Sequence, residues 1–179
     1  MKNRHFLFVL VLALSLSGCA GTPTARPTKP AEKVAVIDDN QIVAGKRIGK
    51  VSIGMPTSQL LDVMGEPTKE YTNSNGSASS YEYGQLFLGV DHRDRSVASV
   101  STTDSDYKTS SGLGVGSSEL RVRAVMGQPL CFARDKYAKD MYFLLYDGII
   151  FNFRGEGISS IGVGDYDPHS YWSGTAKCH

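Results

Sequence analysis

Few side chains in this sequence have the type and spacing that catalysis or metal binding requires. Beyond residue 18 the histidines are His92, His169 and His179, and none lies at metal-ligand spacing from another or beside an evident nucleophile. The turn 165–169 offers two carboxylates and an imidazole to a cation, but an ordinary polar turn explains it equally well. We therefore expect no catalytic residue, no metal site and no cofactor, and interpret the chain as a non-enzyme.

The N-terminus has the pattern of an export signal that ends at a cysteine. Two basic residues precede an apolar run, 6–14, that is too short to cross a bilayer, and Leu-Ser-Gly-Cys follows. This order resembles the signal and lipobox of bacterial lipoproteins. The resemblance implies that residues 1–18 are a signal peptide and that Cys19 is the lipidation site, carrying acyl chains such as palmitate. Because Ala20 rather than aspartate follows, it also implies an outer-membrane location facing the periplasm. An ordinary cleaved signal with an unmodified cysteine is the alternative.

The remaining composition limits the partners. Removal of residues 1–18 takes away two of the 19 basic side chains and none of the 18 acidic ones, which leaves a net charge of −1. Near-neutrality without a basic block argues against a nucleic-acid partner. Residues 19–33 hold three prolines among threonine, alanine and lysine, a composition that favours an extended tether. We expect membrane contact through the lipid anchor and, in addition, an envelope protein as partner.

Two cysteines remain for a disulfide. An exported protein folds in an oxidising compartment, where cysteines pair. With Cys19 assigned to lipid, Cys131 and Cys178 can pair only with each other, and the bridge would fasten the C-terminal tail to the preceding unit. Loop entropy predicts a stabilisation of roughly 3 to 4 kcal/mol. Two buried free thiols are the alternative.

A repeated pattern organises the rest of the chain. Five residues of one stretch recur 62 residues later, which means that one structural unit is used twice. They are Gly54, Val63, Met64, Gly65 and Pro67, matched by Gly116, Val125, Met126, Gly127 and Pro129. Each copy predicts a short helix, which starts at Pro56 or after an N-cap at Ser117 and ends at a glycine.

Each copy continues into a β-hairpin and a final strand. Residues 81–88 alternate around Gly84-Gln85, and residues 142–151 alternate around Asp147-Gly148. A two-residue turn then fixes which side chains lie opposite each other. The pairs are Tyr83 with Leu86, Tyr81 with Leu88, Tyr146 with Ile149, Leu144 with Phe151 and Tyr142 with Phe153. The predicted fold class is α+β, with two tandem helix-plus-antiparallel-sheet units, 34–110 and 111–179 with the tail, and helices on one face of the sheet.

These motifs resemble a known family. They are Gly54-Met55, then Val63-Met64-Gly65-Glu66-Pro67, then Tyr81-Glu82-Tyr83 and a final apolar strand. This order is similar to the small SmpA/OmlA (BamE-like) lipoproteins of the outer-membrane barrel-assembly machinery. Their fold is shared with the β-lactamase inhibitor protein (BLIP-like), which carries two such units. The chain departs from both, since the assembly members have one unit and the inhibitor has a disulfide in each unit.

Side-chain alternation predicts which sheet face is free. The pairs above share an apolar face that the helices should cover, whereas the other face is polar in the first unit and apolar in the second. We predict that this second face holds the partner-binding surface, made of Phe87, Met141, Phe143, Leu145, Ile150 and Arg154. Alternatively the C-terminal tail, residues 34–37 or residues 104–112 cover it as core.

The sequence thus predicts a lipid-anchored cell-envelope protein that acts as a non-catalytic protein-binding or scaffold module. Envelope assembly and inhibition of a periplasmic enzyme are the two roles considered. A binder of a small apolar ligand or lipid, in a pocket between the two units, is the alternative.

Overall fold

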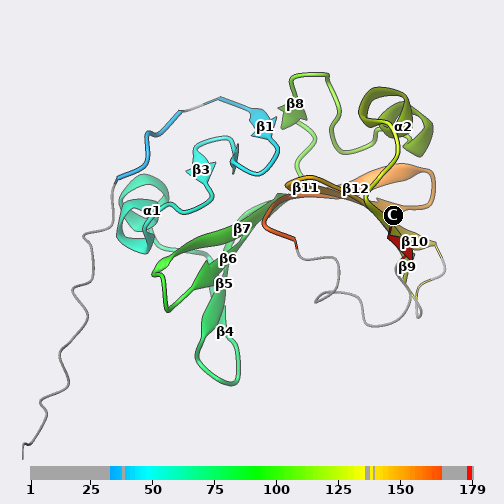
Figure 1. Cartoon of the computed structure of the whole chain (residues 1–179). Coiled ribbons are helices and arrows are strands. Elements are labelled where there is room, and N and C mark those ends of the chain that lie inside the picture. Colours follow the sequence, from blue (N-terminus) through cyan, green and yellow to red (C-terminus); the bar gives the residue numbers. More distant parts are fainter. Residues whose placement is uncertain (1–32, 38, 136–137, 139, 167–176, 179) are drawn as a thin grey trace, which may run out of the picture. The chain divides into compact units, whose positions relative to one another are not determined.

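A nine-stranded antiparallel sheet runs through the computed structural model, which describes residues 33–37, 39–135, 138, 140–166 and 177–178 (Figure 1). In sheet order its strands are β13 (Lys177–Cys178), β9 (Cys131–Arg134), β10 (Met141–Tyr146), β11 (Ile149–Arg154), β12 (Gly157–Gly164), β7 (Ser96–Thr102), β6 (Leu86–Asp91), β5 (Ala78–Tyr83) and β4 (Lys69–Thr72). We call β4 to β7 the first half of the sheet and β9 to β13 the second half. The final strands of the two repeats, β7 and β12, pair with each other and join the halves.

The hairpin registers predicted from side-chain alternation are confirmed. The Gly84-Gln85 and Asp147-Gly148 turns place opposite each other the residue pairs that a two-residue loop requires. In the first half these are Tyr83 with Leu86 and Tyr81 with Leu88, and in the second Tyr146 with Ile149, Leu144 with Phe151 and Tyr142 with Phe153.

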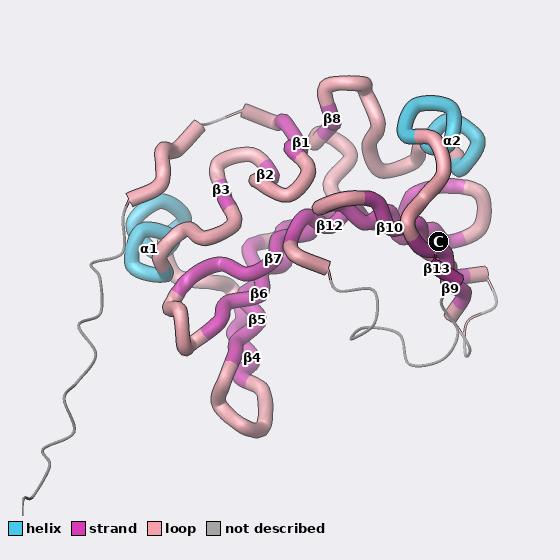
Figure 2. Tube along the Cα trace, in the orientation of Figure 1, coloured by secondary structure: helices cyan, strands magenta, loops and turns pink. Residues whose placement is uncertain are grey.

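A second layer covers one face of this sheet (Figures 1 and 2). It consists of α1 (Thr57–Met64), α2 (Glu119–Met126) and a four-stranded sheet of β3 (Val51–Ser52), β2 (Arg47–Ile48), β1 (Gln41–Val43) and β8 (Lys108–Thr109). The core between the layers includes Leu60 of α1, Val122 of α2, Ile48 of the small sheet and Phe151 of the large one, all fully buried. Neither of the two described helices is long and apolar enough to span a bilayer.

The predicted fold class is wrong. The described residues form a mostly β structure with one continuous nine-stranded sheet and a separate four-stranded sheet, rather than two helix-plus-sheet units. The two repeats are merged because β7 and β12 hydrogen-bond to each other, so neither half has a sheet of its own. The four-stranded sheet further ties them, because β1 pairs with β8 and the Gly45 N–H donates to the Gly148 carbonyl over 2.8 Å.

The repeated glycines end the two helices, and a tyrosine from the sheet binds each end. Gly65 and Gly127 have positive φ angles of 75° and 78°, a conformation that glycine adopts without strain. The Tyr83 hydroxyl donates to the Gly65 carbonyl over 2.9 Å, and the Tyr146 hydroxyl donates to the Gly127 carbonyl over 3.0 Å. The repeat is therefore a structural device that joins each helix to its own hairpin.

The start of α2 differs by one residue from the prediction. Ser118, not Ser117, is the N-cap, and its hydroxyl accepts from the Arg121 N–H over 3.3 Å. The Ser117 hydroxyl instead accepts from the Gly114 N–H in the preceding turn. Because the two serines are adjacent, the sequence does not show which of them caps the helix.

Candidate functional site

The sheet face that points away from the core is covered in the second half. Phe143, Leu145 and Ile150 are only 8%, 1% and 5% exposed, and with Cys131 and Ala133 they form a second buried cluster. These three side chains therefore do not form an exposed partner-binding surface, and that part of the prediction is wrong.

Two described parts of the C-terminal segment, Tyr166 and β13, contact the second half of the sheet. Tyr166, two residues after β12, packs against the cluster, and a Cβ added at Gly162 would collide with its hydroxyl and with Ile150. The predicted disulfide is present and links Cys131 of β9 to Cys178 of β13, which pairs with β9 at the sheet edge. Of the segments that were alternatives to a partner, the structure thus shows Tyr166, at the start of the tail, packed on this cluster.

Met141 and Arg154, the other second-half members of the predicted surface, lie opposite each other at the open end of the β10–β11 hairpin. Met141 is half-buried and Arg154 is exposed, and the Arg154 Nη2 contacts the Met141 Sδ at 3.3 Å. They lie at the margin of the buried cluster, where they do not by themselves make a patch.

The same sheet face is open around Phe87 in the first half. Phe87 is 40% exposed, and its neighbours across the strands are Glu82 on β5 and Ser101 on β7. One residue pair further along, Gly89 lies between Ser80 and Ser99. Small side chains thus surround one exposed aromatic ring, so a partner could approach the sheet closely there. Phe87 is the large apolar member of the predicted surface that the structure leaves accessible.

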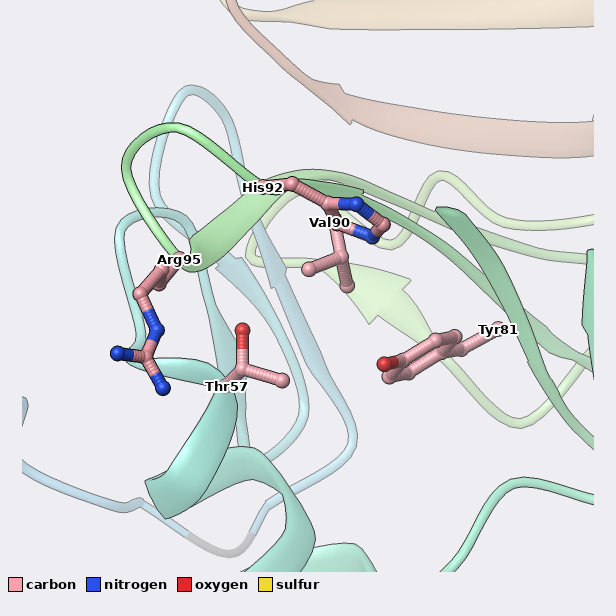
Figure 3. Close-up of a pocket in the computed structure, with 5 residues that line it drawn as sticks. All are labelled: Thr57, Tyr81, Val90, His92 and Arg95. Carbon is pink, nitrogen blue, oxygen red and sulfur yellow. The ribbon is translucent and has the colours of Figure 1, made fainter. Parts of the chain in front are cut away.

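A pocket of about 280 Å³ opens on the core side of the first half (Figure 3). Its lining comes from Thr57 at the start of α1, Tyr81 of β5, Val90 of β6, and His92 and Arg95 of the β6–β7 turn. On one side of the pocket the start of α1 is held against the β6–β7 turn, because the Thr57 N–H donates to the Arg95 carbonyl over 2.9 Å.

The β6–β7 turn gives the pocket its charge. The Asp91 carboxylate accepts from the Arg93 side chain and from the Arg93 and Asp94 N–H groups, and these contacts hold the pKa of Asp91 below its usual range. Arg95 has a φ of 52°, which is uncommon for a residue other than glycine. Its guanidinium makes no ion pair with a described residue, so it is available to an anionic group in the pocket.

His92 is held by both ring nitrogens. Its Nδ1 lies 2.8 Å from the Gly76 carbonyl, and its Nε2 lies 2.9 Å from the Ser79 hydroxyl. A carbonyl can only accept, so Nδ1 carries the proton that it donates. The Ser79 oxygen also contacts Thr72 at 2.9 Å and Glu70 at 3.2 Å, which completes a network between two strands, β4 and β5, and the β6–β7 turn.

The serine–histidine contact has the geometry of a nucleophile and its base, but the surroundings oppose catalysis. Ser79 is 2% exposed, and three side chains already occupy its hydroxyl. A nucleophile must reach a substrate atom, which this hydroxyl cannot do without breaking the network. We therefore assign the Ser79–His92 pair to holding the β4–β5 hairpin against the β6–β7 turn.

A second polar cluster lies under α2. Glu119 forms an ion pair with Arg123 at 2.7 Å and accepts a hydrogen bond from the Tyr142 hydroxyl. Burial and the bond to Glu119 raise the pKa of Tyr142 to about 12. Burial opposes ionisation of Glu119, but the bonds from Arg123 and Tyr142 outweigh it and hold its pKa below the usual range. The Tyr142 ring stacks on Phe153 with the ring centroids 4.7 Å apart, which fixes the tyrosine between sheet and helix.

Several sequence predictions fall outside this description. Cys19, His169 and His179 are not among the described residues. Within the described residues, no group of three or more histidine, cysteine or acidic side chains could hold a metal ion.

Comparisons with known proteins give only distant likenesses. No protein-family model matches the chain, and no curated protein matches its sequence. The structure is similar to a DUF4309 family protein, YjgB, from Bacillus subtilis, with 14% identity, a TM-score of 0.46 and coverage of 67% of this chain and 87% of that one. These findings do not confirm the resemblance to the SmpA/OmlA lipoproteins or to the β-lactamase inhibitor protein.

Two further solved structures are comparably distant. One is an extracellular protein containing an SCP domain from Bacillus anthracis, with 10% identity and a TM-score of 0.44; the match covers 80% of this chain but only 49% of that protein. The other is the uncharacterized protein yfeY from Escherichia coli, with 11% identity, a TM-score of 0.44 and coverage of 74% and 99%. Likenesses of this size carry no inference about function.

Proposed function

We propose that this chain is a non-catalytic binding module held in the bacterial cell envelope by a lipid on Cys19, and that it binds a partner protein through the sheet face around Phe87. The observation that supports this is the contrast between the halves of one sheet face. The second half is covered by the chain itself, whereas the first half leaves Phe87 40% exposed.

The composition of this face suits a protein partner. Aromatic side chains are enriched among the residues that dominate binding energy, and small neighbours let a partner pack around them. Tyr71 of the edge strand β4 is 59% exposed and lies opposite Ser80, so it adds a second ring to the same face. Lys69 and Glu82, paired at 3.1 Å, provide a charged rim.

The envelope location rests on two features. The Cys131–Cys178 disulfide is typical of proteins that fold outside the reducing cytoplasm. The segment before the described residues resembles a lipoprotein signal. Replacement of Cys19 by serine should move the protein from the membrane to the soluble fraction, and unchanged fractionation would count against the anchor.

Site-specific photo-crosslinking tests the binding surface. A photoreactive amino acid at Phe87 should capture one defined envelope protein, and the same group at Lys46, an exposed residue of the β1–β2 turn, should not. The captured protein, once purified, should bind the wild-type chain but not Phe87→Asp, whose thermal unfolding should be unchanged. Equal capture from both positions, or binding that Phe87→Asp leaves intact, would refute the surface.

The second candidate function is the binding of a small polar ligand in the pocket lined by Thr57, Tyr81 and Arg95. Arg95 favours it, because its guanidinium makes no ion pair with a described residue. Because Arg95, Thr57 and Tyr81 line this pocket within the first half, it is neither apolar throughout nor placed between the two repeats. A panel of small carboxylates and phosphates should raise the unfolding temperature of the wild type but not of Arg95→Ala. A rise in both proteins, or in neither, would exclude this site.

A further inference from the structure

The two helices occupy equivalent positions in the two repeats, so their residues can be compared one by one. With the repeat offset of 62, Gln59 corresponds to Arg121, Leu60 to Val122 and Val63 to Val125. Leu60 and Val122 both point into the core and are fully buried. At about 100° per residue, position 59 or 121 and position 63 or 125 then form one flank of each helix beside the core-facing stripe.

In the first repeat this flank is occupied by the chain itself. The Gln59 side chain accepts from the Val34 N–H over 2.8 Å and donates to the Val34 carbonyl. In extended backbone the N–H and carbonyl of one residue point to the same side, so the chain passes Gln59 with an extended backbone at Val34. Under this segment Gln59 is only 7% exposed.

In the second repeat the same flank is bare. Val125 is 44% exposed, Arg121 is exposed, and Leu120, which lies about 100° further round the helix from Arg121, is 80% exposed. The Arg121 guanidinium makes no hydrogen bond or ion pair with any described residue, since only its backbone N–H bonds to Ser118. We call Leu120, Arg121 and Val125 the α2 flank.

We propose that the α2 flank binds an extended segment of a partner protein that carries valine-like apolar side chains next to an aspartate or glutamate. The extended form follows from the first repeat, where an extended segment fills the equivalent place. The acidic residue follows from Arg121, because a guanidinium has only donors and cannot accept from a backbone N–H as the Gln59 amide does. Its natural partner is a carboxylate, bound through two parallel N–H groups.

This site is separate from the surface around Phe87. The helix α2 belongs to the layer that covers the core face of the large sheet, whereas Phe87 lies on the opposite face (Figures 1 and 2). A failure at one site therefore leaves the other untouched, and the chain could hold two partners at once.

The test uses the full chain and two synthetic peptides, capped at both ends, in which valine alternates with aspartate or with lysine. The aspartate peptide should bind and shift the amide resonances of α2, and the lysine peptide should bind at least about tenfold more weakly. The Arg121→Glu variant should reverse this preference. The Lys46→Glu variant, which makes the same charge change in the β1–β2 turn, should keep it.

Four outcomes would overturn the proposal. Two are the absence of binding by the aspartate peptide and equal binding of the two peptides by the wild type. The others are detachment from anionic lipid vesicles, or loss of self-association, caused by Leu120→Glu. Either of these would assign the α2 flank to the membrane or to a second copy of the chain.

Discussion

The bond between Gln59 and the backbone of Val34 allows a prediction that can be worked out in detail. Replacing Gln59 by methionine keeps the length of the side chain and removes both hydrogen bonds. Each such bond contributes about 1 kcal/mol net, but Val34 is only half-buried and its backbone can return to water. We therefore expect a loss of about 1.5 kcal/mol, which lowers the unfolding temperature of a domain this size by roughly 3 to 6 °C.

The Gln59→Glu variant adds a pH dependence with a definite sign. A glutamate can accept from the Val34 N–H, but its ionised form faces the Val34 carbonyl without a proton to donate. Burial and this carbonyl raise the pKa of the introduced carboxyl in the folded state. A group with a raised folded-state pKa contributes stability that is complete below its unfolded pKa and is lost as pH rises through the folded one. The difference in free energy of unfolding between wild type and Gln59→Glu should thus be small at about pH 4 and large at neutral pH.

Thermal unfolding at several pH values and amide hydrogen exchange measure both effects. In Gln59→Met the amide of Val34 should exchange much faster, while those of β11 in the core should change only in proportion to global stability. Exchange of the Val34 amide at the wild-type rate, or a difference between Gln59→Glu and wild type that widens toward acid pH, would contradict this prediction.

Three further changes test other parts of the structure. Phe143→Ala should cost about 3 to 4 kcal/mol in urea unfolding, because it opens a cavity in the second cluster, and a loss below about 0.5 kcal/mol would mean that this side chain is at the surface after all. Replacing Cys131 and Cys178 by serine should cost about 4 kcal/mol for a separation of 47 residues, and full thiol labelling of the denatured, non-reduced wild type would contradict the bridge. An ultraviolet absorbance titration should give Tyr142 a pKa of about 12. Its contribution to stability is therefore complete below the ordinary tyrosine pKa and is lost as pH rises through about 12. Glu119→Gln should lower the pKa of Tyr142, and an unchanged pKa would exclude the Glu119 bond as a cause.

The hairpins could be predicted because their signals are local. Alternation along 81–88 and 142–151, with a glycine in each turn, determines which residues lie opposite each other, and the structure has these pairs. The helix ends could be predicted because each is a glycine, which adopts a positive φ without strain. Pairing between distant strands has no such local signal. The pairing of β7 with β12, which joins the two halves of the sheet, therefore could not be predicted from the sequence.

The four-stranded sheet was missed for a related reason. Its strands contain only two or three residues, too few to show a period of two, and β1 pairs with a segment that begins at Lys108, far along the chain. Alternation also identifies which side chains share a face but not what covers that face. Alternation therefore places Phe143 on a free face, although its side chain is buried in the second cluster.

The polar network of the candidate site could have been found by extending one register. Because Ser79 lies opposite Val90, the residue two places further on, His92, emerges on the same face beside that serine. Arg95 carries no comparable signal, since its exposure and its positive φ depend on how the turn docks against α1.

The two edges of the large sheet suggest how this protein avoids aggregation. An open edge strand presents unpaired N–H and carbonyl groups that can recruit another chain. At one edge β4 is short, and Lys69 and Glu70 place charges on it. At the other edge β13 has two residues and is held by the disulfide. Reducing conditions would therefore release β13 and uncover the backbone edge of β9, so the disulfide also protects this protein against edge-to-edge association.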